Sequence, residues 1–316
     1  MIDSFAEIPE IVIDYVRSVF ATANDKVTRA MCAHPSMHEE SLDHILIMEL
    51  SSISPAFFAH EQVGVSLESH WLGGRHLFDR WEIADIAFFV LLRRAGQLAA
   101  RKVALLQTKR LYSKEIPVVP IDPFDYRVGI GRLVDRTDPQ VPLTWQRHFR
   151  FEGQCIYAAM SAGHDQVQRI DLYEESRGIP VYYGFYNPLT IPYDADYPAS
   201  NGCSPTASND VGMRVLAAKT VHAALAHLDM GRAPTFDGLA ISKLDPKDAE
   251  SAHGWRIENF VADEVLRCRQ GRRFDSTTDQ KLVDLLYRRS APIAAAITIT
   301  IDVGSQEHLP PFAVSG

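Results

Sequence analysis

The sequence predicts an α/β protein with a mixed β-sheet flanked by helices, and two observations carry that prediction. Two short apolar runs, 83–92 and 102–107, are separated by the turn signal Arg94-Ala95-Gly96-Gln97. Such a pair is typical of two buried antiparallel strands. A helical pattern at 166–177, ended by Gly178, is followed closely by an apolar strand pattern at 179–186. A helix followed by a strand in this way indicates a crossover onto the sheet of the hairpin.

Composition excludes several classes of protein. A chain of 316 residues with 46% hydrophobic residues can bury a large core. The longest apolar runs fall short of a membrane span and the start shows no signal-peptide core, so we expect a cytoplasmic protein that does not enter a membrane. The four cysteines form no CxxC pair and the twelve histidines show no HExxH or HxH spacing. Neither a zinc ribbon nor a disulfide framework is therefore predicted.

Two helices are expected before the first strand. Apolar residues spaced by three and four over 4–22 predict an amphipathic helix, which would pack against the core or against a second copy of the chain. A second helix opens at His38 and ends near Ser54-Pro55. At 100° per residue, Glu39 projects onto the apolar face of this helix, whereas Glu40 points nearly the opposite way. Acidic residues in the first turn of a helix are also common because they interact favourably with the helix dipole. This purely structural role remains an alternative for Glu39.

The segments between and after these elements are predicted to be a short strand, loops and further ordered structure. A short strand is expected at 62–67, followed by a glycine-containing loop in which Arg75 could meet a phosphate. The segment from Pro117 to Pro142 is rich in Pro, Asp and Gly and reads as a surface excursion. Ordered structure is expected to resume at 149–159, and 192–209 is loop-like.

The pattern of the C-terminal third predicts further helices and a strand, but shows no spacing of residues that is typical of a catalytic site. Helices are expected at 215–228, 262–270 and 277–289, and a last strand at 292–301. We therefore expect an N-terminal helical segment (1–36), a core (37–192) and an α/β C-terminal extension (193–316). The extension would cover the sheet, form an interface or set specificity.

Three polar groups stand out in the apolar hairpin. Folding the chain about Gln97 places Asp85 opposite Lys109, and Gln107 shares a face with Lys109 because side chains alternate along a strand. A carboxylate at such a place is costly to bury without a metal ion or another cation beside it. These residues are therefore the leading candidates for a functional site.

The charge pattern supports a second hypothesis. The net charge is −8, yet seven basic residues and no acid lie between Arg93 and Lys114. Such a strip on an acidic body can bind a phosphate-bearing ligand at one face. The alternative, that these residues merely keep strand ends and a turn solvated, stays open.

The order Glu39 or Glu40, Asp85, Gln107-x-Lys109 resembles the PD-(D/E)xK nuclease superfamily. The run KVALLQTKRLY is similar to the Mrr-like branch, in which glutamine replaces the second acid. Gln168-x-x-x-Leu172 followed by IPVYYGFYNP is similar to uncharacterised bacterial members. The resemblance covers about residues 39–190. It departs from the family pattern in two ways, since no proline precedes Asp85 and the second acid is missing.

The resemblance implies a restriction-endonuclease-like core: a helix, a mixed sheet whose central strands carry the site, and a second helix against it. It also implies a metal-dependent nuclease that hydrolyses phosphodiester bonds of DNA, with a role in bacterial defence against foreign DNA. Asp85, Gln107 and Glu39 would bind Mg²⁺, with Mn²⁺ as an alternative. The missing acid leaves the number of ions open. Lys109 would orient the water or stabilise developing charge, with Glu40 as the other candidate acid.

The residue types fit that chemistry independently of the resemblance. Mg²⁺ prefers oxygen ligands and usually needs only one or two protein carboxylates, and a bound metal ion lowers the pKa of water and polarises phosphorus. Candidate nucleic-acid contacts are Arg75, Arg101, Lys102, Arg110 and Gln168.

Other readings remain open at this stage. Tyr182, Tyr183 and Tyr186 read as core packing, with base stacking as the alternative. A non-catalytic nucleic-acid-binding or regulatory module, and an interaction protein that assembles through its acidic surface, are the competing functions. Cutting both strands of a duplex would be simplest for a homodimer.

Overall fold

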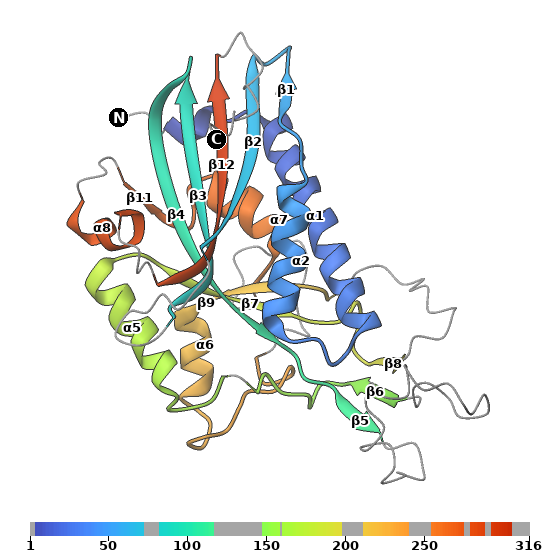
Figure 1. Cartoon of the computed structure of the whole chain (residues 1–316). Coiled ribbons are helices and arrows are strands. Elements are labelled where there is room, and N and C mark those ends of the chain that lie inside the picture. Colours follow the sequence, from blue (N-terminus) through green and yellow to red (C-terminus); the bar gives the residue numbers. More distant parts are fainter. Residues whose placement is uncertain are drawn as a thin grey trace, which may run out of the picture.

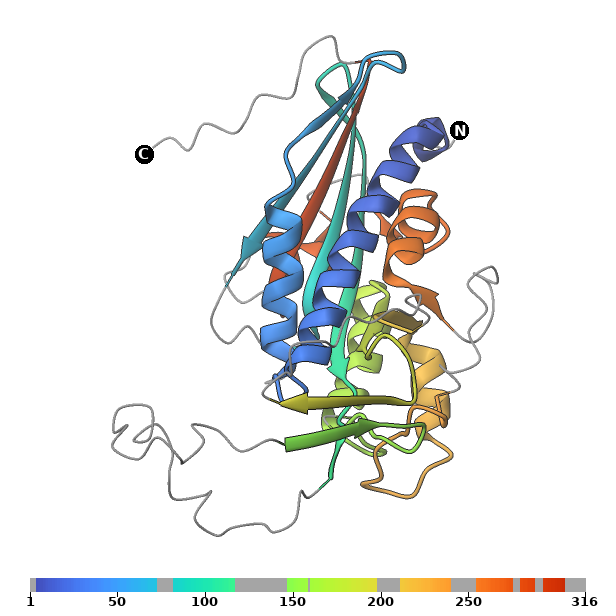
Figure 2. The same cartoon turned by 90° about the vertical axis from the view of Figure 1, so that its right-hand side faces the viewer.

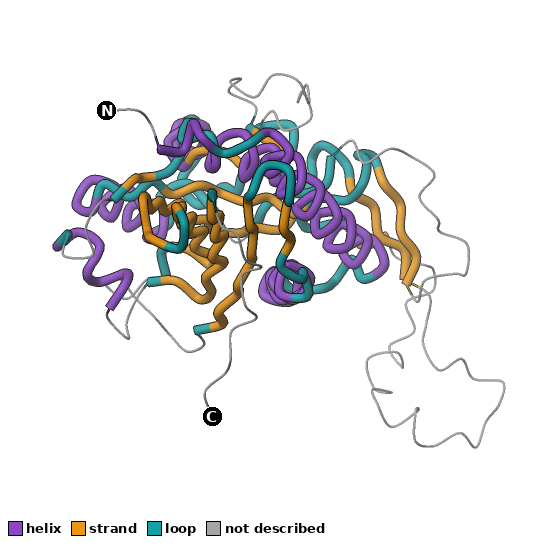
Figure 3. The backbone as a smooth tube through the Cα atoms, turned by 90° about the horizontal axis from the view of Figure 1, so that it is seen from above, coloured by secondary structure: helices purple, strands orange, loops and turns teal. Residues whose placement is uncertain are grey.

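The computed structural model describes residues 4–72, 82–116, 147–158, 160–197, 211–239, 254–274, 279–287 and 292–304. They form an α/β fold with a nine-stranded mixed sheet and a separate three-stranded antiparallel sheet (Figure 1). The predicted class, a mixed sheet flanked by helices, is confirmed. Figures 1 and 3 show the smaller sheet at one end of the molecule.

The elements occur in the following order along the chain. The helices are the 3-10 helix η1 (Ser4–Glu7), α1 (Glu10–Ala33), α2 (Glu39–Ser51), α5 (Asp165–Arg177), α6 (Ala218–Leu225), α7 (Ile257–Asn259), the π-helix η3 (Phe260–Leu266) and α8 (Gln280–Tyr287). The strands are β1 (Ala56–Phe58), β2 (Val63–Trp71), β3 (Ala84–Arg94), β4 (Gln97–Arg110), β5 (Lys114–Ile116), β6 (Arg147–Phe151), β7 (Val181–Tyr186), β8 (Tyr193–Tyr197), β9 (Arg214–Ala217), β10 (Trp255–Arg256), β11 (Arg272–Arg273) and β12 (Ile293–Val303).

The last strand of the chain lies in the middle of the main sheet. The strand order is β1-β2-β12-β3-β4-β7-β9-β10, with β11 pairing with β4. β12 runs antiparallel to β2 and parallel to β3 (Figure 1). Its sequence, IAAAITITIDV, is buried along most of its length, as expected of a strand covered on both faces. The strand predicted at 292–301 is therefore confirmed. Its place, however, differs from the expectation that residues 193–316 form an extension packed on a finished core.

The N-terminal helix is also part of the core. α1 buries eleven residues, and it packs beside α2 and against α7 and η3 (Figure 2). Because burial of apolar surface is the main stabilising contribution to folding, α1 holds the sheet face together. Of the two roles expected for the helix at 4–22, packing against the core is the one observed.

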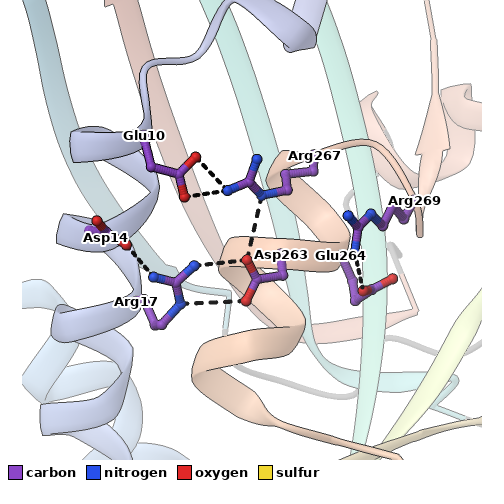
Figure 4. Close-up of polar contacts among 7 residues, drawn as sticks. All are labelled: Glu10, Asp14, Arg17, Asp263, Glu264, Arg267 and Arg269. Atoms are coloured by element: carbon purple, nitrogen blue, oxygen red, sulfur yellow. Dashed lines mark hydrogen bonds and ion pairs between the residues drawn. The ribbon is translucent and has the colours of Figure 1, made fainter. Parts of the chain in front are cut away.

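Ion pairs fix the position of α1 on the π-helix. Arg17 of α1 donates to Asp263 at 2.8 Å, and Arg267 donates to Glu10 (Figure 4). These side chains are partly exposed, so each pair contributes at most about 1 kcal/mol. The pairs therefore set how α1 is oriented, while apolar packing supplies most of the stability.

The two faces of the sheet are covered by different helices. Tyr186 of β7 donates to Asp43 of α2 at 2.7 Å, whereas Tyr183 of the same strand lies 3.0 Å from the ring of His222 of α6. Successive side chains of a strand point to opposite faces. α2 and α6 therefore lie on opposite sides of β7.

The hairpin is confirmed, but its register differs from the predicted one. Ala95 and Gly96 form the turn with φ of 45° and 79°, and the paired residues run from Arg94↔Gln97 to Ile86↔Leu106, with a bulge at Leu92/Arg93. The prediction that Asp85 lies opposite Lys109 is wrong, since the next position along this ladder is Gln107. A shift of two residues leaves the side chains on the same face.

The crossover after the hairpin is confirmed. α5 ends at Gly178, whose φ of 64° gives a left-handed C-cap and whose N–H donates to the Glu174 carbonyl. β7 then pairs parallel to β4, from Leu105↔Val181 to Arg110↔Tyr186. This arrangement places α5 beside the end of the hairpin.

The remaining elements agree in part with the pattern of the sequence. The strand expected at 62–67 is β2, but the helix expected at 215–228 begins as a strand, β9, before α6. The helical patterns at 262–270 and 277–289 correspond to η3 and α8. The segment 117–142 and Arg75 lie outside the described residues. No helix in the described ranges is long and apolar enough to span a bilayer.

Candidate active site

A cavity of about 900 Å³ opens where β4 continues past the start of β3. All five residues predicted to be catalytic line it: Glu39, Glu40, Asp85, Gln107 and Lys109. They come from α2, β3 and β4, which are separated in the chain but adjacent at this point. The structure therefore brings the predicted residues together.

Asp85 occupies the point where the β3–β4 ladder ends. The last paired residues are Ile86 and Leu106, so the Thr108 N–H finds no ladder partner on β3 and donates to Asp85 Oδ2 at 2.5 Å. The Thr108 hydroxyl and Gln107 Nε2 approach the same oxygen at 2.8 and 2.5 Å. Burial raises the pKa of Asp85 above its usual value, although Lys109 and the bonds from Thr108 oppose that shift.

A second buried acid, Asp43, stands behind Asp85. Asp43 follows Glu39 by one turn of α2 and is 4% exposed. Its Oδ2 lies 2.9 Å from the Thr108 hydroxyl and its Oδ1 accepts from Tyr186 at 2.7 Å. Burial and the neighbouring Asp85 hold the pKa of Asp43 well above its usual value. Because a hydroxyl has one proton to donate, the Thr108 hydroxyl satisfies both acids best when one of them is protonated.

Sequence analysis missed Asp43. The available signal was its spacing of four from Glu39, which places both acids on the inward side of one helix. Asp43 belongs to this face together with Leu42 and Leu46, both fully buried. An acid on an apolar helix face needs buried donors, and such donors cannot be recognised before the partner strands are known.

Glu39, rather than Glu40, lies beside the lysine. Lys109 Nζ is 3.5 Å from Glu39 Oε1, and the Lys109 side chain is almost fully buried. Glu39 Oε2 is buried with no hydrogen-bond partner among the described residues. Burial raises the pKa of Glu39, Lys109 lowers it, and Asp85 raises it further. Glu40 is exposed at the rim of the cavity.

The glutamine that reaches the site from α5 is Gln166. Its Nε2 donates to Gln107 Oε1 at 3.2 Å and to the Glu82 carbonyl at 3.1 Å. Gln168 is exposed, and Gln166 alone of the two lines the cavity. The two residues lie about 200° apart around the helix, so they face different directions. The helix was predicted correctly. Gln168, predicted as a nucleic-acid contact, does not line the cavity, and Gln166 is the glutamine of α5 that does.

The basic residues of the hairpin do not form one surface. Lys102 is fully buried and donates to the Val265 carbonyl at 2.8 Å. Arg110 is 4% exposed, and its pKa is lowered by burial. The prediction that Lys102 and Arg110 contact nucleic acid is wrong for this reason: both side chains serve buried carbonyl groups. Arg101 is partly exposed, and Arg75 lies outside the described residues.

Arg110 instead positions α2. Its guanidinium donates to the carbonyls of Pro35 and Met37, the former at 2.9 Å, and lies 4.1 Å from the centre of the Tyr112 ring. These carbonyls belong to the segment that leads into α2. Arg110 therefore determines where Glu39 begins the helix.

The three tyrosines of β7 pack in the core. Tyr182, Tyr183 and Tyr186 are at most 2% exposed, so no nucleobase can reach their ring faces. The reading of these residues as core packing is confirmed, and base stacking on them is excluded.

The donor set limits the kind of metal ion that the cavity could bind. Among the described residues, no three His, Cys, Asp or Glu side chains form a metal-binding group by themselves. Two carboxylates and one amide oxygen remain, from Glu39, Asp85 and Gln107. This set fits Mg²⁺, which usually keeps several waters and takes one or two carboxylates. Glu39 Oε2, which is buried without a hydrogen-bond partner among the described residues, is an oxygen that could ligate such an ion.

Gln107 would have to rotate to bind such an ion. In this structure its Nε2, not its Oε1, points to Asp85. Turning the amide by half a turn would place an oxygen beside Asp85. The same rotation would turn Gln107 Nε2 toward Gln166, whose own Nε2 now donates to Gln107 Oε1. The amide of Gln166 would therefore have to rotate as well.

The acids of the cavity predict how stability depends on pH. The pKa values of Glu39, Asp43 and Asp85 are raised in the folded protein, chiefly by burial. The folded state then retains protons that the unfolded chain releases near pH 4. The stabilisation is therefore complete below about pH 4 and is lost as pH rises through the folded pKa values. In EDTA, we expect the melting temperature at pH 5 to exceed that at pH 8.

Differential scanning fluorimetry would measure this slope, and two variants would assign it. Asp43→Asn keeps the shape of the side chain and should flatten the slope, whereas Asp229→Asn, at an exposed position, should leave it unchanged. Millimolar Mg²⁺ should also reduce the slope, because a bound cation stabilises the ionised acids. Equal slopes for the wild type and Asp43→Asn would contradict the assignment.

Comparison of the chain with protein-family models, with curated proteins and with solved structures gave no match. The function is therefore argued from the residues of this cavity and from the order of the elements that carry them.

Proposed function

We propose that this chain is a metal-dependent nuclease that hydrolyses phosphodiester bonds of DNA. The observation that carries the proposal is the meeting of Glu39, Asp85, Gln107 and Lys109 on one cavity. Asp85 lies beside Gln107, and Glu39 lies beside Lys109. A carboxylate, an amide and a buried ammonium together suit the binding and cleavage of a phosphate ester.

The order of the elements supports a restriction-endonuclease-like core. The helix α2 carries Glu39, the antiparallel strands β3 and β4 carry Asp85 and Gln107-x-Lys109, and the crossover helix α5 precedes β7. β12 is an addition to that core, inserted between β2 and β3. The strands that bear the site are central in the sheet, as the resemblance implies.

Asp85, Glu39 and, after rotation, the amide oxygen of Gln107 would hold Mg²⁺ or Mn²⁺. The bound ion would neutralise charge at the phosphate and supply an activated water. It would also favour binding at this cavity, because Glu39, Asp85 and the other acids that line it repel a phosphate.

The other roles belong to side chains. Glu39 Oε2, which is buried and has no partner among the described residues, accepts a hydrogen bond from the attacking water. Lys109 Nζ donates to an oxygen of the phosphate as negative charge develops there. Asp43 and Thr108 hold Asp85 in place through the hydroxyl that contacts both acids.

A second candidate is a nucleic-acid-binding module without catalysis. One observation favours it: the amide of Gln107 donates to Asp85, an arrangement that satisfies the acid without a metal ion. Two further points extend the first proposal. One is a role in bacterial defence against foreign DNA. The other is assembly as a homodimer, since two copies could cut the two strands of a duplex.

The test is cleavage of plasmid DNA, linear DNA and RNA by the purified protein with Mg²⁺, with Mn²⁺ and with EDTA. We expect DNA cleavage that requires the metal. Glu39→Gln should lower the rate by about a hundredfold or more, the scale seen when one catalytic group is removed. Glu40→Gln, the adjacent and exposed acid, should stay within about threefold of the wild type. Binding without cleavage under every metal would favour the second candidate.

A further inference from the structure

One aromatic side chain is left uncovered on the wall of the proposed active site. Trp71, at the end of β2, is 53% exposed and lines the cavity with Glu39, Asp85 and Lys109. Among the Phe, Tyr and Trp side chains whose burial the structure describes, it is the exposed one. An exposed indole on a functional cavity marks a surface for an apolar or aromatic group of the ligand.

The indole is held in place by its surroundings. His44 of α2 lies with its ring centre 5.8 Å from that of Trp71, and the two ring planes are perpendicular. Trp71 is paired with Ala295 of β12 in the sheet, so its backbone is fixed as well. A rigid aromatic surface loses little conformational entropy when it binds a flat ring.

The chemistry of the cavity identifies what would stack there. The charged groups on the cavity would be occupied by the metal ion and the phosphate of the proposed reaction, and neither can use an indole face. A nucleobase attached to that phosphate offers a π-surface, and stacking on an aromatic residue tolerates any base. The tyrosines of β7 cannot take this role because they are buried.

We infer that Trp71 stacks an unpaired nucleobase next to the scissile phosphate, so that the substrate is a nucleic acid with an unstacked nucleotide at the cleavage site. Bases inside a duplex are already stacked on each other, and reaching the indole requires a single strand, a loop or an extruded base. This inference rests on the proposed function and specifies the substrate class of the same site.

Binding of labelled oligonucleotides would test the inference independently of cleavage, with Ca²⁺ in place of Mg²⁺. The probes are a 12-nucleotide single-stranded DNA, the same strand with abasic positions, and a blunt duplex. Trp71→Ala should weaken binding of the intact single strand by about tenfold, since one stacked base contributes about 1–3 kcal/mol. Duplex binding should change by less than about twofold.

Two further variants and one probe serve as controls. Trp71→Phe keeps a stacking surface and should restore most of the affinity. Leu98→Ala removes an exposed apolar side chain at the turn end of β4, outside the cavity, and should have no effect. On the abasic strand, the wild type and Trp71→Ala should bind alike because no base is present to stack.

Failure of the inference and failure of the proposed function give different results. Equal binding of the single strand by wild type and Trp71→Ala, an equal loss on single strand and duplex, or no binding by the wild type would overturn the inference. Cleavage that requires Asp85 would still support the nuclease in the first two cases. Conversely, Trp71-dependent binding of the single strand with no cleavage under any metal would reject the nuclease and, with it, a stacked base beside a scissile phosphate, and would leave Trp71 as a base-binding residue of a non-catalytic module.

Discussion

Replacing Asp85 with asparagine is expected to lower metal-dependent cleavage by about a thousandfold or more. The substitution keeps the shape of the side chain but removes the one carboxylate that lies between Gln107 and Thr108. Without its charge, a divalent cation is held chiefly by Glu39, and both metal affinity and transition-state stabilisation fall. Initial rates of plasmid nicking across a Mg²⁺ titration would measure the effect.

The same substitution is expected to stabilise the protein in EDTA. Asp43 and Asp85 share the Thr108 hydroxyl, and Asp85 raises the pKa values of Asp43 and Glu39 by repulsion. Removing one charge relieves that repulsion, so the melting temperature should rise while activity disappears. A substitution that raises the melting temperature and lowers activity identifies a residue that serves function at the expense of stability. Cleavage near the wild-type rate in Asp85→Asn would place the reaction elsewhere.

Lys109→Met is expected to lower the cleavage rate by about a hundredfold to a thousandfold. Lys109 is buried beside Glu39, where an ammonium interacts with developing charge more strongly than it would in water. Methionine is an unbranched side chain one atom shorter than lysine, so it fills most of the same space and removes the ammonium with its charge and donors. Single-turnover rates at saturating Mg²⁺ would separate this effect from weaker metal binding.

The chain contains a matched control on the same strand. Lys102 is also a buried lysine of β4, but it lies seven residues away, about 24 Å along the strand. Lys102→Met removes the bond to Val265, so it should change the melting temperature and leave the rate per folded molecule within about threefold. Equal losses of activity in the two variants would mean that both act through stability.

The parts of the fold predicted correctly are those determined by local patterns. The apolar runs around the Ala95-Gly96 turn are sufficient to define β3 and β4, and the helical pattern ended by Gly178 defines α5 and its crossover. The predicted register was two residues out because the turn is centred on Ala95-Gly96 and not on Gln97, which shifts the pairing by three residues, while the bulge at Leu92/Arg93 shifts it back by one. Such a bulge is determined by twist and packing, which a pattern of hydrophobic residues does not record.

The parts that were missed depend on contacts between distant segments. The sequence pattern predicts a strand at 292–301, but it does not identify the neighbouring strands, and this strand lies between β2 and β3. Asp43 became recognisable only once Thr108 and Tyr186 were placed beside it. Lys102 was expected at the surface because basic residues usually lie there, but its ammonium is buried and donates a hydrogen bond to the Val265 carbonyl.

The central place of β12 has a consequence for biosynthesis. A ribosome completes β2 and β3 about two hundred residues before it makes the strand that joins them. Until then Asp85 belongs to a hairpin with an open edge, and pairings so distant along the chain form slowly. A translation product without β12 would therefore lack a closed sheet beneath the strand that carries Asp85, so the proposed nuclease would become active only after β12 has been made.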